Sequence, residues 1–346
     1  MSSRLFGTLG ERPVREVVIS SGQARASIIE YGAVVRDLEV QLADGTWQRV
    51  VLGLETLEDY VAHSPHFGAI PGRYANRIAG GRFVLDGAVH HLPLNQAGKH
   101  SLHGGGEGFG KRCWTILSHD ESSVTLGLVS PAGEAGYPGA LTATCRYMLA
   151  GAALRIELMA ITDAPTVVNL CNHSYFNLDG SADILDHQLS VRANLMTPVD
   201  ADLIPDGSLA PVSGTPFDFR VARPIRQAAA DGARFWYDHN FVLRRDRREA
   251  DRSGLDLAQA AVLSSPKSGL SMETWTTAPC MQLYDSAKMN VPVPGLGGAA
   301  YGPCAGLCLE TQAAPDSPNL PHLPSTVLRP GEVYRHITEY RFSARR

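Results

Sequence analysis

Short stretches in which hydrophobic and polar residues alternate, separated by turn-forming residues, dominate the chain. Residues 334–342 alternate in the way expected of an antiparallel strand with one buried face. Residues 141–148 and 154–161 flank Ala150-Gly151 and predict a hairpin. Strands of the same kind are expected at residues 26–31, 33–41, 82–85, 123–129 and 307–311. The strand at 33–41 ends close to Asp44-Gly45, a strong hairpin-turn signal.

Helical patterns are few and short. Residues 56–61 and 224–230 predict one or two helical turns each. Residues 256–263 are ambiguous by propensity, but the turn cluster at 265–269 and the β-prone run at 270–275 favour a hairpin there. The sequence shows no internal repeat, low-complexity segment or linker. We therefore predict an all-β fold, a large antiparallel β-sandwich with few short helices.

Composition supports a folded chain with a large core. The chain has 346 residues, of which 44% are hydrophobic and 19% charged. Its length alone suggests about two domains, but the continuous strand pattern favours one domain over residues 1–346. The 34 glycines and 22 prolines are spread along the chain, as a protein with many turns requires.

The charge balance and the hydropathy of the chain exclude some classes of binding partner. Lys and Arg number 31 against 35 Asp and Glu, a net charge of −4, which argues against a nucleic-acid binder. No run of 18 apolar residues exists, so no membrane-spanning helix is expected. The first residues lack the apolar stretch of a secretory signal, and we expect a cytoplasmic protein. In that compartment we expect reduced thiols rather than disulfides at the six cysteines, which stand at positions 113, 145, 171, 280, 304 and 308.

Several signatures of cofactor and metal chemistry are missing. The glycine-rich run at 104–110 has neither the spacing of a dinucleotide-binding loop nor the ending of a P-loop. His63 with His66, and His90 with His91, have no carboxylate at ligand spacing, and we interpret them as surface or turn residues. The sequence therefore predicts neither a cofactor nor a metal.

Four polar clusters lie in or beside predicted strands, at residues 72–83, 95–105, 172–178 and 309–319. Taken singly, each cluster is explained by a structural role, because its residues can stabilise a turn, occupy a loop or form an ion pair. Together they supply Asn, Arg, His, Glu and aromatic side chains, the set that binds sugars. Amides and guanidinium groups read hydroxyls, and aromatic faces pack on the apolar side of a sugar ring. A His and a Glu that face one another also form an acid/base pair for neutral pH.

The sequence resembles the aldose 1-epimerase (galactose mutarotase) family over nearly its whole length. The resemblance rests on ordered motifs, which are GRYANRI at 72–78, Leu102 to Gly105, NHSYFNL at 172–178, Tyr237 to Asn240, Gln282 to Tyr284, Leu309 to Asn319 and Leu328 to Tyr334. It implies a one-domain, galactose mutarotase-like supersandwich that needs no cofactor or metal.

The resemblance also implies residue roles. The family's catalytic base corresponds to Glu310 and its general acid to His173. His103 is expected to hydrogen-bond the sugar close to its ring oxygen. The expected contacts to sugar hydroxyls come from Asn76, Arg77, Asp238 and Gln282.

These roles agree with the chemistry of anomer interconversion. The anomeric hydroxyl loses a proton while the ring oxygen gains one, the C1–O5 bond breaks, and the open aldehyde rotates and recloses. Each proton transfer is worth roughly 10²–10⁴ in rate. We expect burial to raise the pKa of Glu310 and a neighbouring carboxylate to keep His173 protonated.

Two alternatives stay open. A non-catalytic sugar-binding β-sandwich would keep the hydroxyl-reading residues and tolerate loss of Glu310 or His173. A hexose-phosphate mutarotase would need extra cations at the pocket rim, for which Arg73 and Arg77 are the candidates. Residues 278–298 depart from the family's usual pattern, which leaves the preferred aldose undefined. We expect a monosaccharide substrate and a monomer or homodimer.

Overall fold

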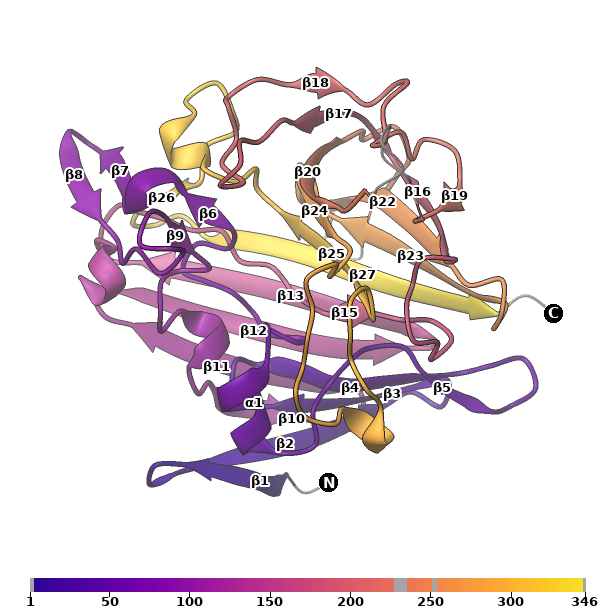
Figure 1. The fold of residues 1–346 in the computed structure, drawn as a ribbon. Helices are drawn as coiled ribbons and strands as arrows, with labels where there is room; N and C mark the ends of the chain where they lie inside the picture. The colour runs from indigo at the N-terminus through magenta and orange to yellow at the C-terminus, as the bar shows by residue number, and fades with distance from the viewer. Residues whose placement is uncertain (1–2, 227–234, 251–253, 345–346) are drawn as a thin grey trace.

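Antiparallel strands form most of the computed structural model, which describes residues 3–226, 235–250 and 254–344 (Figure 1). The largest sheet has ten strands, and the alternating burial of its long central members matches the alternation in the sequence. In spatial order its strands are β10 (Thr115–His119), β11 (Ser123–Ser130), β12 (Leu141–Ala150), β13 (Ala153–Thr162), β27 (Tyr334–Ala344), β23 (Leu270–Thr276), β22 (Asp256–Ser264), β16 (Gln188–Val191) and β19 (Arg223–Pro224), with β21 (Arg248–Ala250) paired to β22.

A six-stranded sheet packs on one end of the large sheet (Figure 1). Its strands in spatial order are β15 (Tyr175–Phe176), β25 (Leu307–Gln312), β24 (Cys280–Tyr284), β20 (Asp238–Leu243), β17 (Ala193–Thr197) and β18 (Ala210–Pro211). The Tyr340 hydroxyl of β27 donates to the Leu309 carbonyl of β25 over 3.2 Å, and the rings of Phe176 and Tyr340 lie 4.6 Å apart. These contacts join the two sheets through the main hydrophobic core.

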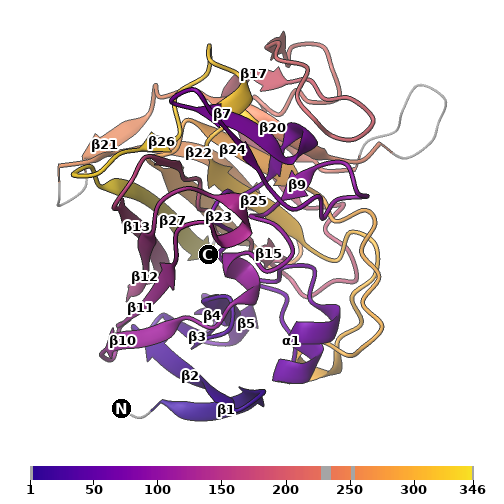
Figure 2. The same ribbon diagram turned by 90° about the vertical axis from the view of Figure 1, so that its left-hand side faces the viewer.

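The N-terminal segment forms a five-stranded sheet that lies beside β11 and β12 (Figure 2). Its strands are β1 (Arg4–Leu9), β2 (Arg12–Ser20), β3 (Ala24–Ile29), β4 (Val34–Gln41) and β5 (Trp47–Arg49). The buried Tyr147 hydroxyl donates to the Ala33 carbonyl and fixes this sheet to β12. Three two-stranded sheets complete the fold, pairing β14 (Thr166–Val167) with β26 (Val327–Leu328), β6 (Arg77–Ile78) with β9 (Ser101–Leu102), and β7 (Arg82–Leu85) with β8 (Ala88–His91).

Helices are short, as the sequence predicts. The described residues contain one α-helix, α1 (Leu57–His63), whose N-cap Thr56 accepts a hydrogen bond from the Asp59 amide. The 3₁₀ turns are η1 (Ala79–Gly81), η2 (Phe109–Lys111), η3 (Glu134–Gly136), η4 (Leu296–Gly298) and η5 (Ser317–Asn319).

The strand predictions are confirmed, including the hairpin of β22 and β23. The helix predicted at 224–230 is wrong at its start, because Arg223 and Pro224 pair with β16 as a strand. Residues 227–230 lie outside the described part of the chain.

Strand β25 connects the hydrophobic core to the site. Both of its faces are covered, and all six of its residues are buried. Thr311 faces the large sheet, where its hydroxyl lies 2.6 Å from that of Thr338. Side chains alternate along a strand, so Glu310 and Gln312 project from the opposite face.

Candidate functional site

Three adjacent strands place polar side chains in one row across the outer face of the six-stranded sheet. Gln282 of β24 lies opposite Glu310 of β25, and Asn240 of β20 lies opposite Gln282. Directly opposed residues of antiparallel strands share a face, so all three side chains meet there. All three are buried, and Gln282 Oε1 and Asn240 Oδ1 have no partner among the described residues. The row therefore offers acceptors for the hydroxyl groups of a ligand.

His173 reaches this row from the segment that follows β14. Backbone hydrogen bonds from His173 N to Ala69 O and from Gly68 N to His173 O fix the segment in place. His173 Nε2 then lies 3.5 Å from Glu310 Oε2. The Cys308 thiol lies 3.5 Å from His173 Nδ1 on the other side of the ring. The imidazole is thus held between a thiol and the carboxyl group, with Nε2 facing the carboxyl.

The loop that carries Asn76 and the loop that carries His103 are locked to each other. Asn76 N donates to His103 Nδ1 over 3.1 Å, and His103 N donates to Asn76 O over 3.0 Å. Gly104 makes this approach possible, because at φ +85° a Cβ there would lie 1.9 Å from the Gly72 carbonyl oxygen. Burial lowers the pKa of His103 well below its usual value, so the ring is neutral. Since Nδ1 accepts a hydrogen bond, the ring proton lies on Nε2, and His103 is a fixed donor.

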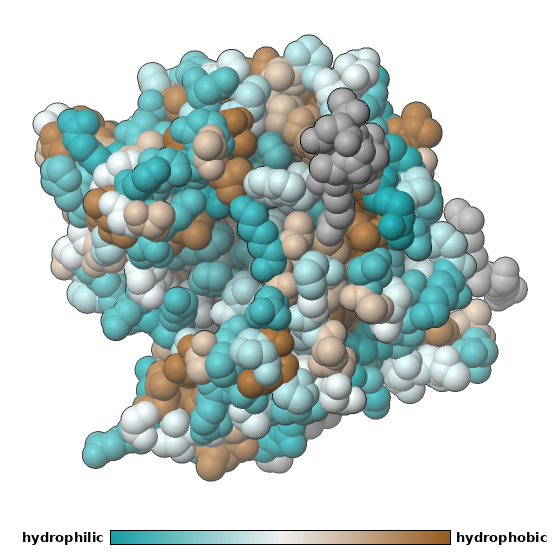
Figure 3. All heavy atoms as spheres, viewed as in Figure 1, coloured by the Kyte–Doolittle hydropathy of each residue, from teal (hydrophilic) through white to brown (hydrophobic). Residues whose placement is uncertain are grey.

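Asp238 links the Arg77 loop to the six-stranded sheet. Arg77 Nη2 lies 3.3 Å from Asp238 Oδ2, and Gln282 Nε2 donates to Asp238 Oδ1 over 2.6 Å. Arg77 Nε also donates to Gln96 Oε1 over 2.9 Å. The face of the molecule viewed in Figure 3 is hollowed near its centre, and hydrophilic residues gather around the hollow. All seven site residues expected from the sequence, Asn76, Arg77, His103, His173, Asp238, Gln282 and Glu310, thus lie within one connected network.

Burial dominates the electrostatics of this network. It raises the pKa of Glu310 to about 8, with further increase from Asp238 and an opposing effect of Arg77. The direction expected from the sequence is confirmed. For His173 the expectation is wrong, because burial, reinforced by the His66 ring, lowers its pKa to about 3. A neutral carboxylic acid supplies no charge to hold the imidazole protonated. Burial therefore favours one proton on the pair, held by Glu310.

Two more side chains belong to the site and were not expected from the sequence. His66 was interpreted as a surface or turn residue, but its ring centroid lies 4.7 Å from that of His103 and 5.8 Å from that of His173. Burial lowers the pKa of His66 to about 4, so it adds a third neutral imidazole. The Cys171 thiol lies 3.8 Å from Glu310 Oε2 and donates to it. The one sequence signal that could place Cys171 in the site is its position two residues before His173.

One combination of side chains has the composition of a metal site. His103, His173 and Glu310 each present a ligand atom, all within 4.8 Å of one another. The hydrogen bond from Asn76 N occupies the Nδ1 lone pair of His103, and the proton that it fixes on Nε2 blocks the other. His103 is therefore arranged to donate a hydrogen bond rather than to hold a metal ion.

Comparisons with known proteins assign the chain to one family. The sequence model of the family described as aldose 1-epimerase matches residues 15–341. The chain is 40% identical to galactose mutarotase of Rattus norvegicus over 345 residues, which cover 98% of this chain and 97% of the rat protein. It is 39% identical to aldose 1-epimerase of Escherichia coli over 326 residues, which cover 92% of each chain.

Solved structures give the same result for the fold. An aldose epimerase homologue from C. elegans is 29% identical and superposes with a TM-score of 0.87, covering 96% of this chain and 99% of that one. Galactose 1-epimerase from Lactobacillus acidophilus is 26% identical with a TM-score of 0.80, covering 100% and 99%. The described residues contain no helix long and apolar enough to cross a membrane.

Proposed function

The chain belongs to the aldose 1-epimerase family and interconverts the α and β anomers of aldoses, and we propose that Glu310 and His173 carry the two proton transfers. The observation that supports this assignment is the 3.5 Å contact between His173 Nε2 and Glu310 Oε2. The anomeric hydroxyl oxygen and the ring oxygen are both bonded to C1 of the sugar. An acid and a base that serve these two atoms must therefore lie within a few ångströms of each other, as this pair does.

The protons balance in each direction of the reaction. The Glu310 carboxylate takes the proton of the C1 hydroxyl, the His173 imidazolium gives its proton to O5, and the C1–O5 bond breaks. The products of this step are the open aldehyde, a neutral Glu310 and a neutral His173. After rotation about C1–C2, the O5 hydroxyl attacks the other face of the carbonyl. His173 then recovers its proton, and Glu310 returns one to the carbonyl oxygen.

The protonation state that burial favours is the one that the pair has with the open-chain intermediate. Burial places the shared proton on Glu310 and leaves His173 neutral. The closed sugar requires the same single proton on His173, so binding shifts one proton within the pair and exchanges none with solvent. Hydrogen bonds from the C1 hydroxyl to a carboxylate and from an imidazolium to O5 each favour the charged forms. A site tuned to the intermediate in this way stabilises the state that the uncatalysed reaction reaches least readily.

The surrounding residues orient the sugar in our proposal. His103 donates through Nε2 close to the ring oxygen, and Gln282 and Asn240 accept from hydroxyl groups through their unpartnered oxygens. Asp238, held by Arg77 and Gln282, supplies a carboxylate for a further hydroxyl. Tyr175 lies under the His173 ring at 5.1 Å and supports its orientation.

The hexose-phosphate alternative loses its main support. Arg73 is buried, and its Nη1 donates to the carbonyls of Pro138 and Gly139 over 2.7 and 2.8 Å. Its Nη2 donates to Ser130 Oγ over 2.6 Å. Arg77 is paired with Asp238. Both candidate cations are therefore engaged within the protein, which favours a neutral sugar.

The names of the relatives guide the choice of substrates, and we propose galactose and glucose. Polarimetry on freshly dissolved α-D-galactose, α-D-glucose, xylose and arabinose tests the proposal, with glucose 6-phosphate as the charged comparison. We expect the neutral hexoses to reach anomeric equilibrium faster with enzyme than without it. A rate raised only for the phosphate ester would reject the neutral-sugar proposal. No rate increase with any sugar would favour the non-catalytic alternative.

Three further proposals rest on the sequence alone. They are one domain over residues 1–346, a monomer or homodimer, and a cytoplasmic location. Light scattering coupled to size-exclusion chromatography measures the second directly.

A further inference from the structure

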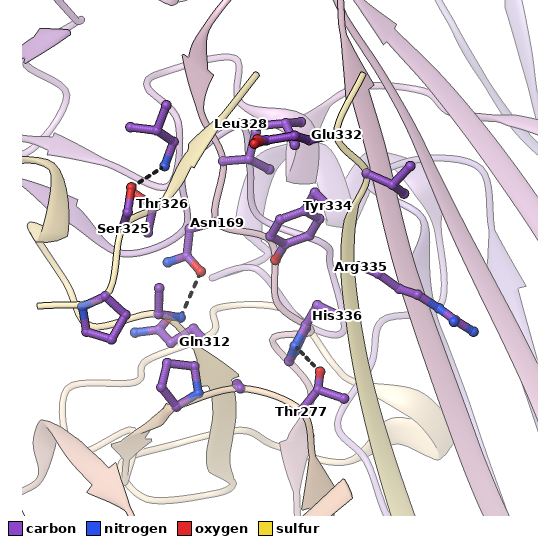
Figure 4. Close-up of a pocket in the computed structure, with 17 residues that line it drawn as sticks. Asn169, Thr277, Gln312, Ser325, Thr326, Leu328, Glu332, Tyr334, Arg335 and His336 are labelled. Carbon is purple, nitrogen blue, oxygen red and sulfur yellow. Dashed lines mark hydrogen bonds between the residues drawn. The ribbon is translucent and has the colours of Figure 1, made fainter. Parts of the chain in front are cut away.

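A cavity of about 410 Å³ lies apart from the catalytic pair, between the end of β25, the turn from β23 to β24, strand β26 and the start of β27 (Figure 4). It has no residue in common with the catalytic and sugar-binding residues named above. Its volume lies within the range of about 300–1,000 Å³ that small-molecule sites occupy. The mouth is exposed at Glu332 and Val333, and the buried side chains of Gln312, His336 and Asn169 line the interior.

Gln312 is the unusual residue of this cavity. Its side chain is 1% exposed, yet neither the amide oxygen nor the amide nitrogen has a hydrogen-bond partner among the described residues. Thr326, whose hydroxyl has Tyr74 as a hydrogen-bonding neighbour, also belongs to the lining. Leaving a buried polar atom unpaired costs about 1–3 kcal/mol. Two such atoms on one side chain of the cavity wall indicate a place where a polar ligand completes the hydrogen bonds.

The remaining polar groups of the cavity define the charge of that ligand. The Arg335 guanidinium is paired with Glu157 at 2.6 Å, and Glu332 Oε2 accepts from Arg329 N over 2.9 Å. His336 is neutral because burial lowers its pKa to about 4. Its ring nitrogens contact hydroxyl groups of Thr277, Thr311 and Thr338 at 3.4, 3.2 and 3.1 Å. Arg335 and His336 therefore leave no uncompensated charge in the cavity, and the Glu332 carboxylate at the exposed mouth, which accepts only from a backbone amide, disfavours an anionic ligand.

The unpartnered atoms also define the shape of the ligand. The Gln312 amide presents an unpartnered donor group beside an unpartnered acceptor. A hydroxyl group donates and accepts at once, so two neighbouring hydroxyls satisfy the amide. The apolar surfaces of Pro279, Pro324 and Val333 suit the C–H side of such a molecule. We propose that this cavity is a second binding site, for a small neutral molecule with vicinal hydroxyl groups such as a polyol or a pyranoside.

The site lies next to the catalytic machinery in the chain. Gln312 follows Glu310 by two residues on β25 and projects from the same face. Asn169 of the cavity wall accepts from Ala313 N over 3.0 Å and donates to Ala75 O over 3.1 Å, immediately before Asn76. The segments that carry Glu310 and Asn76 are thus both hydrogen-bonded to Asn169 of the cavity wall.

Isothermal titration calorimetry with two probes tests the proposal on the full chain. The probes are myo-inositol, a polyol without an anomeric carbon, and methyl β-D-galactopyranoside, a sugar locked in its ring form. The variant Gln312→Met removes the amide at similar volume, and the matched control Gln282→Met makes the same change in the catalytic site. We expect Gln312→Met to weaken binding of at least one probe tenfold or more and to leave the mutarotation rate near that of the wild type. We expect Gln282→Met to slow mutarotation and to leave the binding of that probe unchanged.

Crystals soaked in the bound probe give the location, and we expect its electron density beside Gln312. Thermal unfolding adds a control, since Gln312→Met breaks no hydrogen bond of the described residues and should not lower the Tm. If that variant does not fold, Thr326→Val replaces it in the same titration. Binding by neither probe, binding lost only in Gln282→Met, or density for ordered water alone in the cavity would overturn the proposal. Because mutarotation is measured separately, failure here leaves the catalytic proposal intact.

Discussion

His173 Nε2 lies 3.5 Å from Glu310 Oε2, and burial places the one proton that the two groups share on the carboxyl oxygen rather than on the imidazole. Both residues come from covered segments, and neither is more than 4% exposed. This relationship between an acid and a base in contact underlies the first two predictions.

Replacing either member of the pair should abolish most activity while the protein stays folded. Glu310→Gln keeps the size of the side chain but cannot accept a proton, and His173→Asn cannot donate one to the ring oxygen. We expect each to lower kcat by about 10²–10⁴, the value of one proton transfer. Polarimetry with α-D-galactose measures the rate, and the melting temperature monitors the fold. A near-wild-type rate in either variant would remove that residue from the mechanism.

The pH dependence should show an alkaline limb near pH 8. The pair is active while it holds one proton in total. Raising the pH above the Glu310 pKa of about 8 removes that proton, and kcat/KM should fall about tenfold per pH unit. On the acid side His173 gains a second proton only near its pKa of about 3, so activity should be flat from weakly acidic to neutral pH. With the ordinary pKa values of 4.5 at Glu310 and 6.5 at His173, the shared proton would lie on the imidazole and the alkaline limb would lie near 6.5 instead. A profile of that shape contradicts the proton placement.

Arg77 should act on both binding and proton placement. Its charge lowers the pKa of Glu310, and its Nη2 contacts Asp238. We expect Arg77→Met to raise KM and to move the alkaline limb to higher pH. Arg73→Met is the matched control, because Arg73 binds backbone carbonyls and Ser130 away from the pair. Arg73→Met should lower the melting temperature without moving the alkaline limb. Equal shifts of the alkaline limb in both variants would contradict a specific effect of Arg77 on the pKa of Glu310.

A methyl group at Gly104 should disturb the site through the backbone. The residue has φ +85°, and a Cβ there would lie 1.9 Å from the Gly72 carbonyl oxygen. Gly104→Ala should therefore lower the melting temperature by several degrees and reduce activity by displacing His103. The control is Gly106→Ala, two residues away and exposed, where a Cβ meets nothing within 4 Å. Differential scanning fluorimetry with polarimetry separates the two, and equal Tm values for the variants would refute the steric argument.

Removal of metal ions should not change the rate. His103 is fixed as a hydrogen-bond donor by Asn76 N, so the His103, His173 and Glu310 cluster lacks one of its ligand lone pairs. After dialysis against EDTA, kcat should stay within about twofold of its starting value, whereas removal of a catalytic metal abolishes activity. Restoration of a lost rate by Zn²⁺ or Mg²⁺ would show that the cluster binds metal after all.

Local patterns gave the strands because alternation reports which face of a strand is buried. Residues 141–148 and 154–161 become β12 and β13 with the expected turn between them. The hairpin of β22 and β23 follows from its turn residues. The helix expected at 224–230 failed at its start because tertiary pairing with β16 overrode local propensity at Pro224.

Site residues were predicted where they stand in a sequence motif, and they were missed where only packing brings them to the site. Glu310, His173 and the residues that we propose to bind the sugar stand in recognisable motifs, whereas His66 joins the site through contacts with His103 and His173. Arg73 and Arg77 belong to one motif and look alike in sequence. Arg73 donates hydrogen bonds to backbone carbonyls, whereas Arg77 is paired with Asp238.

The sequence by itself determined the all-β class and the family, and it supplied the residues that we propose as acid and base, because strand alternation and motifs are local properties. Only the tertiary structure decided which of the two holds the proton, since that depends on how far burial removes both groups from water. It also decided that Gln312, two residues from Glu310, faces a different cavity with its amide unpartnered. Burial and hydrogen-bond satisfaction depend on what long-range pairing brings against a side chain, and no local pattern contains that information.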